Sequence, residues 1–217
     1  MALRLADGIH AVRVGSDCVF LGPQDYYCLA LPQDALDLDG TMVTAKLPGL
    51  AEALCEAGLV ASGPANDADR GPAVPGSPDR TARRIVDEQI RAVDRRPRLR
   101  HWWALGLSLV AALRARSRPI SELIARRGPV AAEAPSLRLL SDLTVYRRIL
   151  PWLPIDGLCV FRSHMLISYL NALGHGARWV FGVRTWPFRA HCWLQIGDVA
   201  LDDEAERLAA YHPIMAV

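Results

Sequence analysis

A proline- and glycine-rich stretch after the first quarter of the chain most constrains its architecture. Residues 61–79 contain four prolines and three glycines among nineteen residues, a composition typical of a linker between folded regions. Short strand patterns precede this stretch, and helical patterns follow it. In a chain of 217 residues, we therefore expect a small domain over residues 1–61, a linker over 62–79 and a larger domain over 80–217.

The first region has the pattern of a small mixed module. Alternating apolar residues and turn signals predict three strands followed by two helical stretches, at 10–14, 18–21, 26–31, 40–47 and 48–57. Gly58 is the expected stop of the second helical stretch. A sheet of three strands with two or three short helices predicts a winged-helix-like domain.

The charge of this region argues against a nucleic-acid partner. Residues 1–60 hold three basic and eight acidic residues, whereas a surface that binds nucleic acid should be basic. The other use of such a module is an exposed strand edge that takes up a peptide as an extra strand. Tyr26, Tyr27, Leu29 and Leu31 are the candidate groove residues, although alternate residues of a small strand also form its core. A domain that only supports its neighbour is the remaining alternative.

The middle of the chain is helical and rich in arginine. Residues 80–150 hold sixteen basic and six acidic residues, and helical patterns cover 81–94, 100–116, 120–126 and 136–150. The arginines could hold an acidic partner, but such runs are more typical of solvated helix faces. We expect the apolar residues of the second helix to be core, namely Trp102, Trp103, Leu105, Leu109 and Leu113.

Cysteine usage and hydropathy indicate the compartment. The five cysteines are an odd number without a CxxC spacing, so neither a disulfide framework nor a zinc site is predicted. The N-terminal residues lack the apolar segment of a signal peptide, and the longest apolar run, 102–113, is shorter than the ~20 residues that span a bilayer. We expect a cytoplasmic protein with no membrane partner, metal or cofactor.

A cysteine at the start of a predicted helix is the main candidate for chemistry. Asp156 can cap and Gly157 can turn, and apolar residues then recur at helical spacing until Gly174. Cys159 therefore falls in the first turn, where unpaired N–H groups and the helix dipole favour a thiolate. A single cysteine can equally be a small core residue.

A histidine and two acids follow at positions that suit a nucleophilic site. His191 begins a predicted strand, and Asp202 and Asp203 end the next one, so the order cysteine, histidine, acid is one that a papain-like site can use. A two-residue turn would put Asp202 on the face of His191, and a longer loop would put Asp203 there. His164 lies five residues beyond the cysteine and should point elsewhere.

Several motifs resemble those of the lasso-peptide processing B proteins, which are transglutaminase-like cysteine peptidases. The matching segments are Cys159-Val-Phe-Arg-Ser-His-Met-Leu, Gly182-Val, His191-Cys-Trp-Leu-Gln and Leu201-Asp-Asp. Near the N-terminus, Asp17-Cys-Val-Phe-Leu and Asp25-Tyr-Tyr-Cys-Leu-Ala-Leu-Pro resemble the leader-recognition domain of that family. Cys192 departs from the family pattern, where a small residue such as alanine is usual.

The resemblance implies both a fold and an activity. It implies an α+β architecture in which a winged-helix-like domain precedes a papain/transglutaminase-like domain, with helices packed on an antiparallel sheet. Cys159, His191 and Asp203 would form the catalytic triad of a leader peptidase. Its partners would be the leader of a ribosomally made precursor and an asparagine-synthetase-like lasso cyclase. The alternatives are a transglutaminase-like acyltransferase and a non-catalytic winged-helix binding protein.

Overall fold

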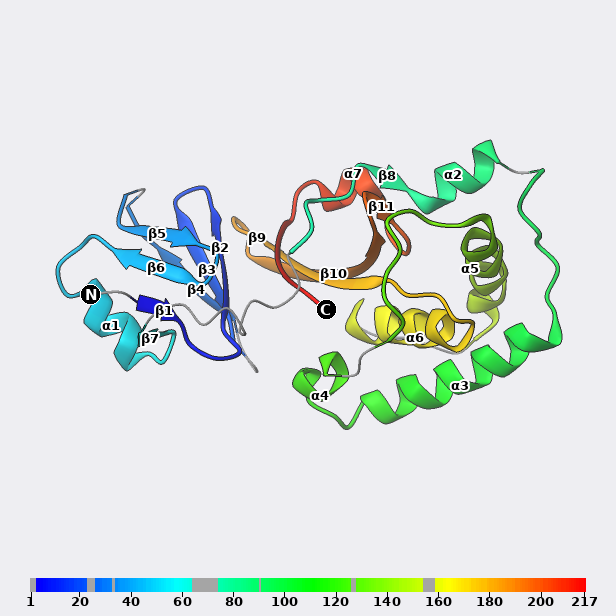
Figure 1. Ribbon diagram of the computed structural model, residues 1–217, viewed down its shortest axis with the longest axis horizontal. Helices are drawn as coiled ribbons and strands as arrows, with labels where there is room; N and C mark the ends of the chain where they lie inside the picture. The colour runs from blue at the N-terminus through cyan, green and yellow to red at the C-terminus, as the bar shows by residue number, and fades with distance from the viewer. Residues whose placement is uncertain are drawn as a thin grey trace.

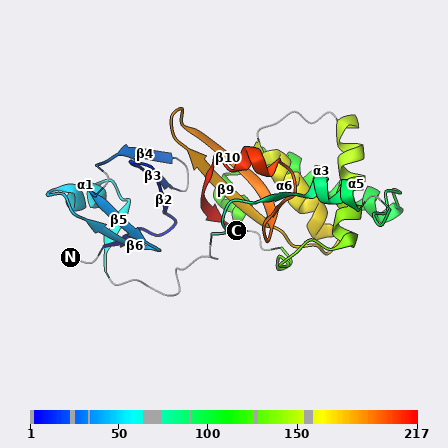
Figure 2. The same ribbon diagram turned by 90° about the horizontal axis from the view of Figure 1, so that it is seen from above.

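The structure is a computed structural model that describes residues 3–22, 26–32, 34–63, 74–89, 91–125, 128–153 and 159–217. An N-terminal lobe made mostly of strands lies beside a larger lobe of helices and a second sheet (Figure 1). The view from above shows the same division, with the hairpin of β9 and β10 extending toward the N-terminal lobe (Figure 2). The chain therefore has a mixed α and β architecture with antiparallel sheets.

Two small sheets and one helix form the N-terminal lobe. The first sheet has the order β2-β3-β4, with strands His10–Val14, Asp17–Leu21 and Tyr26–Ala30. The second has the order β5-β6-β1-β7, with strands Leu36–Asp39, Met42–Ala45, Leu3–Leu5 and Val60–Ser62. Helix α1 covers Leu50–Glu56. The predicted strands at 10–14, 18–21 and 26–31 are confirmed to within one residue at either end.

The helix predicted over residues 40–47 is wrong, because this segment is half of a hairpin. Strands β5 and β6 pair antiparallel with Asp39 opposite Met42, and Gly40 at the turn has a φ of 59°. A two-residue turn after an aspartate favours glycine because it needs a positive φ. Since the described part of this lobe contains seven strands and a single helix, the winged-helix expectation is not confirmed.

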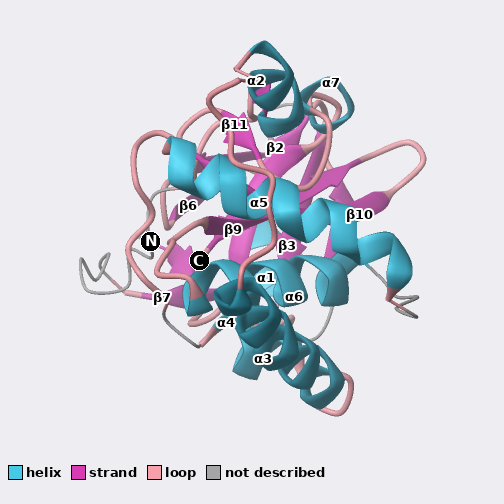
Figure 3. Ribbon diagram, turned by 90° about the vertical axis from the view of Figure 1, so that its right-hand side faces the viewer, coloured by secondary structure: helices cyan, strands magenta, loops and turns pink. Residues whose placement is uncertain are grey.

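The larger lobe stacks helices on one mostly antiparallel sheet. Its helices are α2 Ala82–Glu88, α3 Leu99–Ala115, α4 Ile120–Ile124, α5 Leu137–Ile149, α6 Cys159–Ala172 and α7 Ala205–Leu208, with a 3-10 turn at Leu150–Trp152. The sheet has the order β12-β9-β10-β11-β8, with strands His212–Ala216, Arg178–Arg184, Arg189–Ile196, Val199–Ala200 and Arg80–Thr81. Helix α6 lies between β10 and α3 (Figures 1 and 3).

Strand β3 is buried on both faces and joins the two lobes. Its side chains Cys18 and Phe20 belong to the core of the N-terminal lobe. Val19 and Leu21 point to the opposite face and belong to the core of the larger lobe, together with Val14 of β2. The described chain of the first lobe ends soon after β7, and β8 begins at Arg80. The predicted domain boundaries remain a prediction, but an apolar contact connects the two regions.

Helix α3 corrects the prediction for the two tryptophans. Leu105 is buried, but the side chains of Trp102 and Trp103 are 53% and 61% exposed, and Leu113 is also exposed. Small residues such as Ala104 form much of the buried face, so α3 packs closely on α6 and directs its large side chains outward. None of the helices in the described part of the chain is long and apolar enough to cross a membrane.

Candidate active site

Helix α6 presents Cys159 as its first residue. The predicted cap Asp156 and turn Gly157 lie outside the described residues. The first turn of a helix has unpaired N–H groups, and together with the helix dipole they favour a thiolate over a thiol. The Cys159 side chain is partly exposed, so a substrate can reach it.

His191 lies on β10 and is held by Asp203. The Nε2 atom of His191 hydrogen bonds to Oδ2 of Asp203 at 2.7 Å, and each of the two side chains is 14% exposed. On β9, Gly182 is directly opposite His191. A side chain at Gly182 would come within 2.6 Å of the Trp193 indole, so glycine lets this ring pack beneath the strand. The imidazole is thereby fixed on one side and available on the other.

Two further groups hold the Asp203 carboxylate. The backbone N–H of Glu204 donates to Oδ1 at 2.8 Å, and the Arg207 guanidinium lies 3.6 Å from Oδ2. Burial raises the pKa of Asp203, but the hydrogen bonds from His191 and Glu204 outweigh it, so the pKa lies below its ordinary value. Asp203 is therefore ionised at neutral pH and can hold an imidazolium.

The turn between β10 and β11 shows that turn length does not decide whether Asp202 or Asp203 contacts His191. It is the two-residue turn, with Ile196 opposite Val199, which on strand alternation alone would have put Asp202 beside His191. Strand β11 ends at Ala200, and the N–H of Leu201 makes its last ladder bond, to the Leu194 carbonyl at 2.8 Å. Beyond that point the chain bends away, so strand alternation no longer decides where the two carboxylates point.

The charges of Cys159 and His191 support each other. Hydrogen bonds with the Cys192 thiol and with His191 lower the pKa of the Cys159 thiol to about 4 despite its burial. Hydrogen bonds with Asp203 and Cys159 raise the pKa of His191 to about 9. A thiolate beside an imidazolium is consequently the stable form at neutral pH.

Cys192, the residue that departs from the family pattern, lies next to Cys159. It is 2% exposed and lines the same cavity as Cys159. Its hydrogen bond with Cys159 and its burial raise the pKa of the Cys192 thiol far above the ordinary value. Of the two neighbouring thiols, only Cys159 is therefore ionised.

Ser163 and Asp202 form a buried support that the motif search missed. The Ser163 hydroxyl donates to Oδ2 of Asp202 at 2.7 Å, and the N–H of Leu194 donates to Oδ1 at 2.8 Å. Burial raises the pKa of Asp202. Ser163 follows Cys159 by four residues, which puts both on one face of α6, so helical spacing could have identified it. The hydrogen bond between Ser163 and Asp202 connects α6 to the turn that follows β11.

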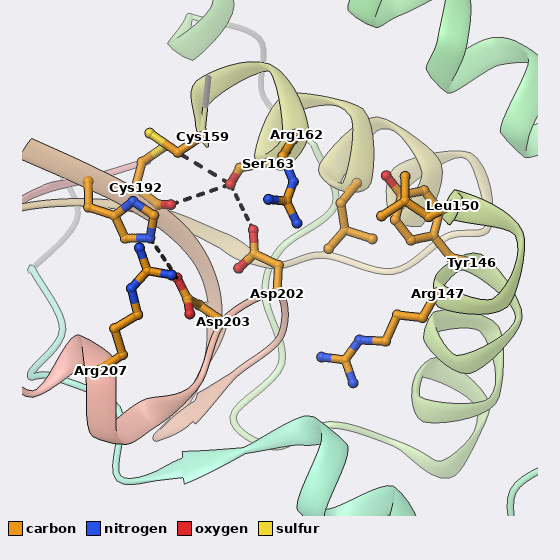
Figure 4. A pocket seen from close by; sticks show the side chains of 12 residues that line it. Tyr146, Arg147, Leu150, Cys159, Arg162, Ser163, Cys192, Asp202, Asp203 and Arg207 are labelled. Atoms are coloured by element: carbon orange, nitrogen blue, oxygen red, sulfur yellow. Dashed lines mark hydrogen bonds and ion pairs between the residues drawn. The ribbon is translucent and has the colours of Figure 1, made fainter. Parts of the chain in front are cut away.

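These residues surround a cavity of about 390 Å³. Figure 4 shows Cys159, Ser163 and Cys192 near one another, Asp202 and Asp203 below them, and the basic side chains of Arg147, Arg162 and Arg207 around this group. The remaining lining includes Tyr146, Arg147, Leu150, Arg162, Leu166 and Arg207. Within the described ranges, no group of three histidine, cysteine or carboxylate side chains could hold a metal ion.

Of the predicted leader-binding residues, Tyr26, Tyr27 and Leu29 lie on β4 and Leu31 follows it, and none of them lines this cavity. Tyr27 is 46% exposed, while Leu29 and Leu31 are partly buried against the core of the N-terminal lobe. The side chain of Tyr26 lies outside the described residues. The strand is at the edge of its sheet, paired with β3. Leu29 and Leu31 therefore contact this core with part of their surface, and their role in leader binding remains a prediction.

A second histidine–aspartate cluster lies in the helical core and was not predicted. Asp142 on α5 has a 1% exposed side chain, and its carboxylate contacts Arg100 at 2.5 Å, His101 at 2.9 Å and His175 at 2.8 Å. The Tyr169 hydroxyl donates to the Asp142 main-chain carbonyl at 3.1 Å. The cluster therefore connects α3 and α5 to Tyr169 of α6 and to His175, which follows α6.

The chain belongs to the transglutaminase-like superfamily, whose domain matches residues 101–216, more than half of the sequence. Members of this superfamily are usually cysteine-dependent enzymes, either peptidases or acyltransferases. The matched range contains Cys159, His191 and Asp203. No curated protein and no solved structure matches the chain.

Proposed function

We propose that this protein is a cysteine peptidase in which Cys159 is the nucleophile, His191 the acid and base, and Asp203 the residue that orients the imidazole. The observation that carries the proposal is a chain of contacts. It runs from Cys159, at the start of α6, through His191 on β10 to Asp203. The chain combines an activated thiol, a proton carrier and a fixed orientation. The superfamily membership adds independent support.

The reaction follows from these positions. The Cys159 thiolate attacks the carbonyl carbon of the peptide bond, and the His191 imidazolium gives its proton to the amine as the C–N bond breaks. The resulting thioester is attacked by water, which gives a proton to the imidazole. The C–S bond then breaks and restores the thiolate. Asp203 stabilises the imidazolium and keeps the Nε2 atom of His191 occupied, so that the other nitrogen faces the thiol.

We further propose that the substrate is the leader-bearing precursor of a lasso peptide, and that the product passes to an asparagine-synthetase-like cyclase. The motifs that resemble the lasso-peptide processing B proteins support this choice. Strand β4 supports a recognition role because, within the described residues, it pairs on one side only. A leader can add along its free edge by backbone hydrogen bonds, with Tyr27 exposed beside it. Tyr26, Leu29 and Leu31 complete the proposed contact.

Acyl transfer to an amine is the second candidate, because the superfamily includes acyltransferases and the same thioester can react with an amine. The two activities give different products from one peptide. Hydrolysis adds the mass of water at the cut bond, whereas transfer adds the mass of the amine. The product masses therefore decide between them.

The test is incubation of the purified full-length protein with a synthetic leader–core precursor and a primary amine, followed by mass spectrometry. We expect a leader fragment with a free carboxylate and a core fragment with a free amine. The Cys159→Ala variant should bind the peptide and leave it intact. Amine adducts as the main product would replace the peptidase by the acyltransferase, and cleavage by Cys159→Ala would exclude this site.

A further inference from the structure

A second cavity adjoins the one around Cys159. It has a volume of about 520 Å³ and lies between α2, α5 and the turn that follows β11. Arg147, Asp202 and Asp203 line both cavities. These three side chains separate the two cavities, so the second cavity is a direct neighbour of the first.

Four arginines line this second cavity, namely Arg83, Arg95, Arg147 and Arg148. A guanidinium cluster of this kind suits a carboxylate, which it can hold by paired N–H···O bonds. Helices α2 and α5 carry three of the four arginines and fix the positions of those three relative to one another. The cavity is therefore built on helices and not on a single loop.

Two of the four acids that line the cavity already have hydrogen-bond partners other than these arginines. Both oxygens of Asp202 are used inside the protein, by Ser163 and Leu194, and Asp203 is bound to His191. Asp87 and Glu204 also line the cavity. Asp87 follows Arg83 by four residues on α2, and at this spacing the negative charge of Asp87 balances the positive charge of Arg83.

Arg95 has unused hydrogen-bonding capacity in this cavity. Its Nε atom is buried and has no hydrogen-bond partner in the described part of the chain. The Arg148 guanidinium lies close to Arg95 and donates a hydrogen bond of 3.4 Å to the Arg95 main-chain carbonyl. A buried guanidinium N–H without an acceptor is costly, and a bound carboxylate would supply that acceptor.

We propose that this cavity is a subsite for an acidic side chain of the peptide, held by Arg95 and Arg148 near the bond that Cys159 attacks. The inference rests on the proposed function and names a feature of its substrate, an aspartate or glutamate. Arg147 is already bonded to the Leu201 carbonyl and forms the wall between the two cavities. Substrates with a neutral side chain at that position react more slowly.

The test uses affinity labels, so that it does not depend on peptide cleavage. Iodoacetyl-glutamate, iodoacetyl-Gly-glutamate and iodoacetyl-Gly-Gly-glutamate are each compared with the glutamine analogue, with every C-terminus amidated. The Cys159 thiolate displaces iodide and forms a C–S bond, and mass spectrometry gives the rate. Each added residue moves the carboxylate by ~3.5 Å. We expect the glutamate label to react about tenfold faster than its glutamine analogue at one spacer length.

Variants identify the side chains responsible. The double variant Arg95→Gln/Arg148→Gln should react equally with both labels, whereas the Arg114→Gln control changes an exposed arginine of α3 outside both cavities and should keep the preference. Circular dichroism checks that each variant is folded. Equal rates for glutamate and glutamine at every spacer length, or a preference that survives the double variant, would overturn the subsite. A wild-type protein that shows the preference but cleaves no precursor would retain the subsite and lose the peptidase.

Discussion

The described part of the protein contains two histidine–aspartate clusters, and their surroundings differ more than their chemistry. Asp203 and His191 lie beside a cavity and contact a thiol. Asp142, His101 and His175 lie among helices, and the Asp142 carboxylate is occupied by three basic side chains. In the first cluster one side of the imidazole remains available, while in the second the hydrogen bonds connect structural elements. The comparison teaches that an accessible thiol, and not the histidine–aspartate pair itself, distinguishes the candidate active site from the second cluster.

The sharpest way to break this comparison is to remove one histidine from each cluster. His191→Ala should lower kcat/KM for precursor cleavage by about 10²–10⁴-fold, because the general base and the stabilisation of the thiolate are both lost. His175→Ala should change kcat/KM of the folded protein by about twofold or less and lower the free energy of unfolding. Steady-state kinetics and urea denaturation measure the two effects. A catalytic loss of equal size in His175→Ala would end the distinction.

Asp142→Ala should produce the largest loss of stability. It leaves Arg100, His101 and His175 without their buried acceptor, and breaking a buried charged contact of this kind costs about 3–5 kcal/mol. Chemical denaturation gives the free energy of unfolding. The rate per folded molecule should stay close to that of the wild type, and an unchanged unfolding midpoint would show that the cluster does not connect the helices as described.

Asp203→Asn should have the opposite effect, with a large loss of activity and a small loss of stability. We expect a loss of about 10²-fold in kcat, smaller than the ~10⁴-fold effect in a serine triad because the thiolate is already formed. The fold should change little, since asparagine can occupy the same space. Asp202→Asn is the matched control and should be milder, because its oxygens contact Ser163 and Leu194 and not His191. Equal damage in the two variants would mean that Asp202 shares the catalytic role.

The two clusters should also differ in their dependence on pH. With pKa values of about 4 for Cys159 and about 9 for His191, the thiolate–imidazolium pair is present between these values, and the rate should fall below the first and above the second. Burial raises the pKa of Asp142, but hydrogen bonds from His175 and His101 outweigh it and leave the pKa lowered. Asp142 therefore contributes stability above its unfolded pKa and loses it as pH falls through the folded value.

The free energy of unfolding measured at acidic pH tests whether Asp142 loses its stabilising contribution as pH falls. Asp142→Asn should flatten the loss of stability on acidification, while Asp203→Asn should alter the alkaline limb of the rate profile. Unfolding free energies and kcat/KM, each measured against pH, report the two effects separately. An acid-sensitive stability that is the same in Asp142→Asn and in the wild type would contradict the assignment.

Sequence reasoning succeeded where local pattern decides structure. Apolar spacing predicted the helix that begins at Cys159, and alternation predicted the strand of His191. It failed where long-range contacts decide. The segment 40–47 has residues that suit a helix, but pairing with β5 makes it a strand. Trp102 and Trp103 are apolar, but small residues on the opposite face of α3 determine which side is buried.

The candidate site shows the same limit. The order of cysteine, histidine and acid was visible in the sequence, because each residue type has a local signal. The choice between Asp202 and Asp203 was not visible from spacing, since the chain leaves the ladder after Leu201. The Asp142 cluster was missed for a related reason, because its members are far apart in the sequence and meet only when the helices pack.

Strand β3 limits how this protein can be rebuilt for other substrates. A chimera that keeps the larger lobe and receives a foreign N-terminal lobe would lose the side chains of Val14, Val19 and Leu21, which fill part of the larger lobe's core. The exposed apolar surface would then favour aggregation before any question of specificity arose. The proposed leader site is better exchanged by altering β4 alone, because the outer edge of β4 can change while β3 stays in place.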